Sequence, residues 1–168
     1  LRDLGSALSP DNAFAIIQGL ETVTLRMKQH CANAEKVVNY LKKHKEITKV
    51  IYSTEHDKPL AERAKKYLKG GNGPMIGIEL KGGIEAGKRF IESLKMFYHV
   101  ANIGDVRSLA IHPASTTHSQ LNEKELAASG VTQSYVRLCI GLEHIDDIIE
   151  DLDQALNKSS KGNLKAVS

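Results

Sequence analysis

The chain has 168 residues, of which 41% are hydrophobic and 26% charged, and its formal net charge is +3. This composition is typical of one globular domain that folds without disulfides or a structural metal. It argues against nucleic-acid binding, because the lysines are spread over expected helix surfaces, and against a membrane span, because no apolar run approaches ~20 residues. With no signal-peptide pattern and two cysteines, Cys31 and Cys139, at apolar positions that suit reduced thiols, we expect a cytoplasmic protein.

A long helix is expected near the start of the chain. The sequence SPD at residues 9–11 supplies an N-cap serine, a proline at the first helical position and an acid in the first turn. Apolar residues then recur with helical spacing, which predicts one helix, or two with a bend near Gly19, from about residue 10 to 43. An unbroken helix would be roughly 50 Å long. We therefore expect residues 1–25 to pack against a surface that lies outside this chain. The chain itself is expected to be a fragment.

Strands and helices alternate after this segment. Strands are predicted at residues 47–52, 75–80, 99–102 and 108–111 and around Arg137, and helices at residues 60–68, 84–94, 123–128 and 145–156. Because no regular βαβ repeat is visible, the predicted fold class is α+β. We expect a mixed or antiparallel sheet of about four to five strands, covered by helices on one face and preceded by the long helix. Residues 158–168 lack an apolar period and are expected to form a disordered tail.

The stretch KGGIEAGK, at residues 81–88, matches the spacing of a phosphate-binding loop. However, Arg89 stands where a magnesium ligand would need serine or threonine, and Glu85 would lie in the anion cradle. We therefore expect no nucleotide site. The seven histidines show no metal-ligand spacing, and no G-x-S-x-G nucleophile motif is present, so we expect no metal site and no serine nucleophile.

The stretch HPASTTHSQL, at residues 112–121, is rich in hydroxyl groups and follows a predicted strand. Its hydroxyls could cap their own backbone and open the next helix. They could instead present donors to a small polar ligand at the end of the strand. The residue pattern leaves both interpretations open.

The stretch SYVRLCIGLE, at residues 134–143, places one arginine in a run that otherwise predicts a buried strand. Because side chains alternate along a strand, Val136 and Leu138 would face the core, and Tyr135, Arg137 and Cys139 the other side. A guanidinium is always charged and offers a planar fork of donors that fits a carboxylate or phosphate. Arg137 could therefore form an ion pair with a nearby acid or bind an anionic ligand.

Several stretches together carry a resemblance to a known family. They are LSPDNAFAIIQGLETVTLRM, HCANAEKVV, ELKGG, ANIGDVRSLAIHPASTTHSQL, YVRLCIGLE and DDIIEDLDQAL. Over residues 1–157 the chain resembles the pyridoxal-phosphate-dependent enzymes of cysteine and methionine metabolism, of fold type I. It is most similar to the carboxy-terminal small domain of the O-acetylhomoserine sulfhydrylases, because of residues 18–22, 101–105 and 112–121. The cystathionine γ-synthases and methionine γ-lyases share most of these motifs and remain alternatives.

The resemblance implies a role for particular residues of this chain. Arg137 occupies the position of the family arginine that grips the α-carboxylate of the amino-acid substrate. Asn102 is implied to contact the same carboxylate, through its side chain or its backbone. Ser108 and Thr116 are implied to lie near the mouth of the site. Cys139 stands where the family usually has serine.

The resemblance also implies what the whole enzyme does. It would be a transferase of alkyl groups that uses pyridoxal 5'-phosphate to convert O-acetylhomoserine and sulfide to homocysteine and acetate, in methionine and cysteine biosynthesis. The intact enzyme is implied to form a homo-oligomer, a tetramer. The cofactor-binding lysine, the phosphate clamp and the aromatic that stacks on the cofactor belong, in the family, to a larger upstream domain.

No counterpart of those upstream groups is found in this sequence. We therefore expect no catalytic, cofactor-binding or metal-binding residue in this fragment, no bound cofactor and no activity from the fragment alone. An alternative from another class is a non-catalytic α/β interaction module. In that case Arg137 would form a structural ion pair, and the long first helix would dock a partner.

Overall fold

The computed structural model describes residues 3–55 and 58–160. The helices in these ranges are α1 (Pro10–Glu21), α2 (Val23–Leu41), α3 (Lys58–Tyr67), α4 (Gly83–Ser93), α5 (Glu123–Ala128) and α6 (Ile145–Ser160). The strands are β1 (Ile47–Ile51), β2 (Met75–Leu80), β3 (Tyr98–His99), β4 (Leu109–Ile111) and β5 (Tyr135–Cys139), and a 3₁₀ turn, η1, covers Pro113–Ser115. This arrangement confirms the predicted α+β class.

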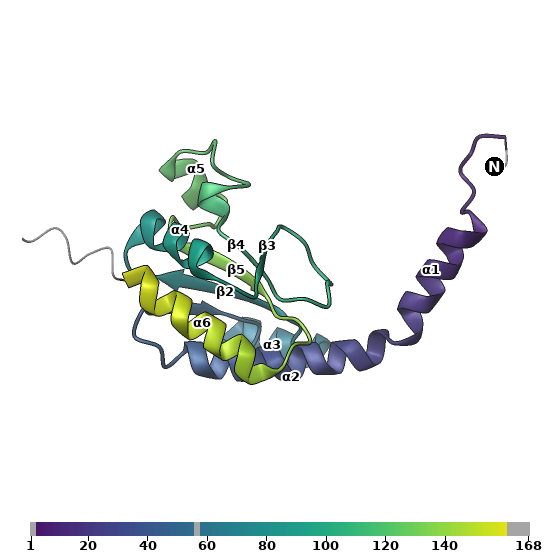
Figure 1. Ribbon diagram of the computed structural model, residues 1–168, viewed down its shortest axis with the longest axis horizontal. Helices are drawn as coiled ribbons and strands as arrows, with labels where there is room; N and C mark the ends of the chain where they lie inside the picture. Colours follow the sequence, from purple (N-terminus) through teal and green to yellow (C-terminus); the bar gives the residue numbers. More distant parts are fainter. Residues whose placement is uncertain (1–2, 56–57, 161–168) are drawn as a thin grey trace, which may run out of the picture.

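The described strands form one mixed sheet in the order β1-β2-β5-β4-β3, with β5 in the middle (Figure 1). Neighbouring strands are antiparallel, except that β3 and β4 are parallel. The strand predicted at residues 99–102 is shorter and begins earlier, because the chain leaves the sheet after His99 and continues as an exposed loop over residues 100–107. Figure 1 shows this loop projecting beside β3.

One face of the sheet packs against helices and forms the core. Ile76 pairs with Leu138, and Ile78 pairs with Val136, so these four side chains share that face, and all are fully buried. Helices α2, α4 and α6 contribute the opposing layer of the core, which includes Val37, Leu41, Phe90, Ile148 and Leu152. The predicted covering of one sheet face by helices is therefore confirmed.

The expected long helix consists of two helices. The break falls at Thr22, just after the predicted bend near Gly19, and Thr22 has φ −111° and ψ 5°. The guanidinium of Arg26 spans the break by donating to the Thr22 hydroxyl and to the Gly19 carbonyl. Helix α1 points away from the body of the molecule, and none of its residues is buried (Figure 1).

An apolar face remains bare along α1 and the first turns of α2. Its exposed side chains are Phe14, Ile16, Ile17, Leu20, Val23, Leu25 and Met27. Large apolar side chains that lie together on a surface mark a place where another surface packs. The expectation that residues 1–25 pack on something outside the chain remains a prediction.

Helix α6 is longer than predicted. It continues to Ser160, so residues 158–160, which were expected to begin a disordered tail, are helical, and Ser159 is 1% exposed. The guanidinium of Arg89, on α4, holds this last turn by donating to the Ser159 carbonyl at 3.0 and 2.9 Å. The rest of the expected tail, residues 161–168, lies outside the described residues.

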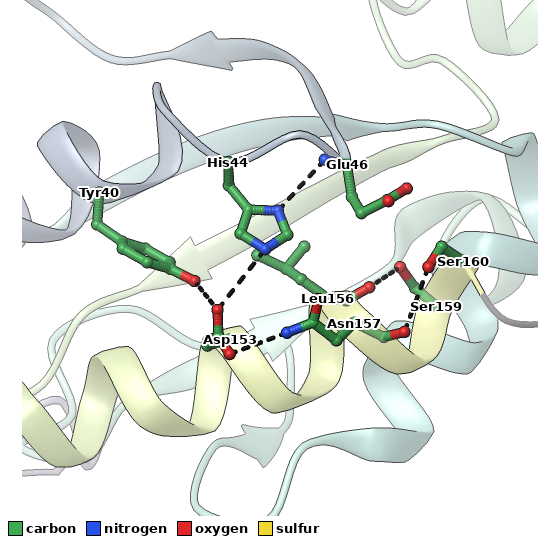
Figure 2. A network of polar contacts seen from close by, with 8 residues as sticks. All are labelled: Tyr40, His44, Glu46, Asp153, Leu156, Asn157, Ser159 and Ser160. Carbon is green, nitrogen blue, oxygen red and sulfur yellow. Dashed lines mark hydrogen bonds and ion pairs between the residues drawn. The ribbon is translucent and has the colours of Figure 1, made fainter.

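A polar network joins the carboxyl end of α2 to α6 (Figure 2). The hydroxyl of Tyr40 donates to Asp153 Oδ1 at 2.5 Å, and Asn157 donates to Asp153 Oδ2 at 2.9 Å. The same Asp153 Oδ1 is 3.7 Å from His44 Nε2. Burial and the Asp153 hydrogen bond raise the pKa of Tyr40, whereas burial lowers the pKa of His44 against the opposing effect of Asp153. The network therefore contains a neutral tyrosine and fixes the helix layer behind the sheet.

Candidate functional site

Arg137 lies on the central strand of the sheet, on the face opposite the helical core. Its register partners are Gly77 in β2 and Ile111 in β4. Val136 and Leu138, its neighbours in sequence, are fully buried against the helices, so the predicted alternation is confirmed. The guanidinium is thus mounted on the middle of the sheet and half-exposed on its other side.

The guanidinium of Arg137 does not form an ion pair with any acid of residues 3–55 and 58–160 within 4.0 Å. Its hydrogen bond in this range is a long one, from Nη2 to the carbonyl oxygen of Asn102 at 3.4 Å. A half-buried guanidinium retains several donors in this arrangement. The geometry therefore favours an anionic ligand over a structural ion pair.

A pocket of about 330 Å³ lies beside Arg137. Its wall includes Tyr52, Met75, Gly77 and Tyr135, together with the polar residues Ser53 and Asn72. The ring of Tyr135 lies where a side chain at Gly77 would be, since a Cβ there would come within 2.6 Å of the ring. Burial raises the pKa of Tyr135, so its hydroxyl is neutral and can donate a hydrogen bond beside the guanidinium.

The predicted residue Asn102 lies next to Arg137 on the exposed loop of residues 100–107. Its carbonyl oxygen accepts the hydrogen bond from Arg137, while its side-chain oxygen accepts from the backbone N–H of Ile103 at 2.9 Å. The structure thus brings Arg137 and Asn102 together. The contact between them uses the Asn102 backbone carbonyl, and the implied contact of Asn102 with a substrate carboxylate stays a prediction.

Cys139 lies on the same sheet face as Arg137 and is 2% exposed. Burial raises the pKa of its thiol, and the backbone N–H of Gly104 and the charge of Arg137 oppose that shift. The thiol is therefore neutral and lies beneath the loop that carries Asn102. Cys31 is also buried, and neither cysteine forms a disulfide.

Ser108 is buried within the fold, and its implied place near the mouth of the site stays a prediction. Its side chain is fully buried, and its hydroxyl donates to Glu143 Oε2 at 2.9 Å and accepts from the backbone N–H of Gly141 at 2.9 Å. The reason is its position in the chain: Ser108 directly precedes β4, and its carbonyl accepts a hydrogen bond from Tyr98 at the start of β3. The Ser108 hydroxyl is therefore engaged inside the fold.

Thr116 also bonds within its own segment. Its hydroxyl donates to the His112 carbonyl at 2.9 Å, and the hydroxyl of Ser115 contacts His112 Nδ1 at 2.8 Å. In the described part of the chain we find no contact that joins Thr116 to Arg137. These bonds agree with the capping interpretation of residues 112–121, although Asn122 rather than a hydroxyl of the loop caps the following helix.

His112 holds this loop against α4. The side chain is fully buried, and Nε2 lies 2.8 Å from the Gln133 carbonyl. Burial lowers the pKa of His112, so the imidazole is neutral, with Nε2–H donating to Gln133 and Nδ1 accepting from Ser115. The ring lies against Gly87, and the glycine of the rejected phosphate-loop motif therefore has a packing role in a helix.

Residues 3–55 and 58–160 contain no group of three or more His, Cys, Asp or Glu residues that could hold a metal ion. No helix of the same ranges is both long and apolar enough to cross a membrane.

Glu143 is a residue of this region that the sequence analysis did not single out. It receives two hydrogen bonds from Ser108, one from the backbone N–H and one from the hydroxyl. The sequence gives one indication that Glu143 belongs to this region: it ends the stretch that carries Arg137, two residues after Gly141. That spacing does not reveal its partner, which lies more than thirty residues earlier in the chain.

Arg137, which pairs with no acid of the described residues, lies beside a pocket on one sheet face, and helices cover the other face. A family match agrees with this arrangement. The family described as Cys/Met metabolism PLP-dependent enzyme matches residues 1–157. The chain belongs to this family of pyridoxal-phosphate-dependent enzymes.

Relatives within the family include enzymes with different named activities. An O-acetyl-L-homoserine sulfhydrylase from Leptospira meyeri is 52% identical over 93% of this chain, and an L-methionine gamma-lyase from Fusobacterium nucleatum subsp. polymorphum is 46% identical over 94%. A crystal structure from Campylobacter jejuni, assigned as an O-acetylhomoserine (thiol)-lyase with a pyridoxyl-lysine monophosphate, matches 93% of this chain with TM-score 0.83 and 45% identity. The chain spans 36%, 40% and 37% of these three proteins, respectively.

Proposed function

We propose that this chain is the small, substrate-binding domain of an O-acetylhomoserine sulfhydrylase. The whole enzyme would convert O-acetylhomoserine and sulfide to homocysteine and acetate, as an alkyl-group transferase of methionine and cysteine biosynthesis in the cytoplasm. The observation that carries the proposal is the free guanidinium of Arg137, half-exposed beside a pocket and unpaired with any acid of the described residues. The identity to a sulfhydrylase over 93% of the chain supports this branch of the family.

In this proposal Arg137 grips the α-carboxylate of the amino-acid substrate. Its planar fork offers two parallel donors to the two carboxylate oxygens, which fixes the orientation of the substrate as well as its affinity. The Asn102 loop lies at the other side of the carboxylate and limits its access to water. Holding the carboxylate aligns the substrate Cα–H for removal, which is a positioning effect rather than a chemical one.

Pyridoxal phosphate, when bound, supplies the electron sink for this chemistry. Among the described residues that line the pocket there is no lysine to which the cofactor could be attached. We therefore assign the attachment lysine and the phosphate clamp to a larger domain that precedes this chain in the protein, and we expect the fragment alone to be inactive. Residues 1–25, whose apolar side chains are bare, would pack on that domain, and the intact enzyme would be a tetramer.

The proposal is tested in the full-length enzyme by the change Arg137→Ala. The KM for O-acetylhomoserine should rise about 100-fold, because a charge-assisted pair to a carboxylate is lost. Arg137→Lys keeps the charge but lacks the fork, and should give an intermediate KM. The matched control is Arg63→Ala, an exposed arginine of α3. Wild-type kinetics in Arg137→Ala would contradict the proposal.

A methionine γ-lyase is the second candidate, because a relative with that activity is 46% identical over 94% of this chain. The two are distinguished by the substrate that the full-length enzyme consumes. A sulfhydrylase should form homocysteine from O-acetylhomoserine only when sulfide is supplied. Consumption of methionine in the absence of sulfide would instead assign the γ-lyase, and the cystathionine γ-synthase alternative requires cysteine as the thiol acceptor.

The length of the coding region distinguishes the hypothesis of a non-catalytic interaction module from the two enzyme hypotheses. An in-frame upstream region that encodes a larger domain supports the enzyme. A native start of translation at Leu1 would support the module.

A further inference from the structure

Glu143 lies outside the residues that the proposed function uses, yet both oxygens of its carboxylate are engaged. Oε1 accepts from the backbone N–H of Ser108 at 2.7 Å, and Oε2 accepts from the Ser108 hydroxyl at 2.9 Å. The hydroxyl in turn accepts from the backbone N–H of Gly141 at 2.9 Å. Hydrogen bonds to a carboxylate are shorter and stronger than those between neutral groups. The contact therefore joins two segments that are far apart in the sequence with a directional polar link.

The link leaves no space for a side chain at Gly141. A Cβ at that position would lie 2.2 Å from Glu143 Oε2 and 2.5 Å from the backbone nitrogen of Ser108. A glycine is therefore required where the turn after β5 passes the carboxylate. The turn and the loop are in van der Waals contact as well as hydrogen-bonded.

The link fixes one end of the loop that carries Asn102. Beside it, the backbone N–H of Leu142 donates to the Val106 carbonyl at 2.8 Å, so the turn after β5 holds the loop at two neighbouring positions. Further along the loop, the carbonyl of Asn102 contacts the guanidinium of Arg137. Between these anchors Ile103 and Gly104 are exposed and Asp105 is half-buried, and the Gly104 N–H contacts the Cys139 thiol. The anchored end therefore contributes to the position of the loop over Arg137.

The turn itself is held from the helix side. The side-chain amide of Asn33, on α2, donates to the carbonyls of Gly141 and Glu143 at 3.1 and 3.0 Å. His30 Nδ1, also on α2, lies 2.7 Å from the Ile140 carbonyl. Since Asn33 and His30 are buried, the carboxylate of Glu143 projects from a rigid base.

We propose that Glu143 is a positioning residue for substrate binding: through Ser108 it fixes the loop of residues 100–107 over Arg137, and thereby completes the site for the substrate carboxylate. This inference rests on the proposed function. It assigns part of the affinity for the amino-acid carboxylate to a half-buried acid that touches no substrate.

The test uses the full-length enzyme with its cofactor and two competitive inhibitors that differ at one group, norleucine and norleucinamide. The inhibition constant of norleucinamide divided by that of norleucine measures the preference for a carboxylate, and a general loss of stability would not change this ratio. In Glu143→Gln, an NH2 group replaces one of the two oxygens that accept hydrogen bonds from Ser108. That hydrogen bond is lost, and the loop of residues 100–107 is no longer fixed at this end. Norleucine should bind about tenfold more weakly, on the scale of one lost hydrogen bond to a charged group, with little change for norleucinamide.

Three further variants make the outcome specific. Glu150→Gln, an exposed acid of α6, makes the same chemical change away from the loop and should leave the ratio unchanged. Ser108→Ala should lower the ratio in the same direction as Glu143→Gln, and it serves as the second probe if Glu143→Gln does not fold. In an Arg137→Ala background, Glu143→Gln should have no further effect, because residues that act through one group are not additive.

The outcomes separate this inference from the proposed function. If Arg137→Ala lowers the ratio and neither Glu143→Gln nor Ser108→Ala does, the positioning role is wrong and the proposed function stands. Additive effects of Arg137→Ala and Glu143→Gln would also overturn the positioning role. If Arg137→Ala itself leaves the ratio unchanged, the proposed function fails and the inference fails with it.

Discussion

The ring of Tyr135 lies over Gly77 on the neighbouring strand, in the space that a side chain at Gly77 would fill. A Cβ at Gly77 would be 2.6 Å from Cε2 and 2.8 Å from the hydroxyl oxygen of Tyr135. Gly77 is also the register partner of Arg137. The glycine thus allows an aromatic ring to lie flat on the sheet beside the guanidinium, where it forms one wall of the pocket.

Gly77→Ala should therefore displace the Tyr135 ring. We expect the free energy of unfolding of the chain to fall by about 1–3 kcal/mol, because an added methyl group overpacks a filled space. Urea unfolding measures this change. Gly70→Ala is the control, since a Cβ there would meet nothing within 4 Å. Combining Gly77→Ala with Tyr135→Ser should cost less than the two changes separately. A strictly additive result would show that the ring does not occupy this space.

Gly87→Ala tests the contact between α4 and His112. A Cβ at Gly87 would lie 2.4 Å from His112 Nε2, and the ring cannot move away without breaking its bonds to Ser115 and Gln133. The expected loss in the free energy of unfolding is about 2–3 kcal/mol, from overpacking and from a buried donor left unpaired. Urea unfolding again gives the value. In contrast, Gly19→Ala in the exposed helix α1 should slightly stabilise the chain. If Gly87→Ala lowered the free energy of unfolding no more than an ordinary surface substitution does, the contact between Gly87 and His112 would be contradicted.

The buried imidazole of His112 predicts how stability depends on pH. Burial lowers its pKa in the folded chain, whereas the unfolded chain has the ordinary value of about 6.5. Below about pH 6.5 the unfolded chain therefore binds a proton that the folded chain does not, so the free energy of unfolding falls as the pH falls, until the pH passes the lowered pKa. Above about pH 6.5 this contribution is constant.

The pH effect is measured by urea unfolding between about pH 7.5 and about pH 5.5. His112→Gln should reduce the slope, because glutamine does not titrate in this range. His44 has a lowered pKa for the same reason, so His44→Gln should reduce the slope as well, and the double variant more than either one. An unchanged slope in His112→Gln would mean that this imidazole is not buried as a neutral group.

Tyr40→Phe tests the network that joins α2 to α6. Removing the hydroxyl leaves Asp153 without its shortest hydrogen bond, and the expected loss is about 1–2 kcal/mol in the free energy of unfolding. Tyr67→Phe is the matched control, because Tyr67 is 68% exposed. Equal effects of the two changes would show that the Asp153 contact does not stabilise the chain.

Much of this fold could be predicted from local residue patterns. The alternation around Arg137 predicted a strand with one buried face, and the N-cap and proline at residues 9–11 placed the start of α1 correctly. The end of α6 was missed because its last turn is held by Arg89, a partner about seventy residues away that no local pattern reveals. The bend was expected near Gly19, because glycine is a stronger helix breaker than threonine. The break lies at Thr22, where the Arg26 side chain stabilises it.

The site could be predicted only in part, for the same reason. Arg137 stood out because a charge in an apolar strand is unusual, and the family resemblance supplied Asn102. The resemblance implied that Ser108 lies near the mouth of the site, but its hydrogen bonds to Glu143, thirty-five residues later, are not visible in any local pattern. Hydrogen bonds between distant segments depend on strand order, which local residue patterns do not reveal.

Because β5 is the central strand, one part of the proposed substrate-binding site is fixed in the sheet and another part lies on a loop that can vary. Arg137 is mounted between β2 and β4 in the middle of the sheet, whereas residues 100–107 form a mostly exposed segment that joins β3 to β4. Under the proposed function, diversifying that segment would retune which amino-acid side chain is accepted while the demand for an acid group stays the same. A directed-evolution library for new substrates would therefore begin there and leave the strand untouched.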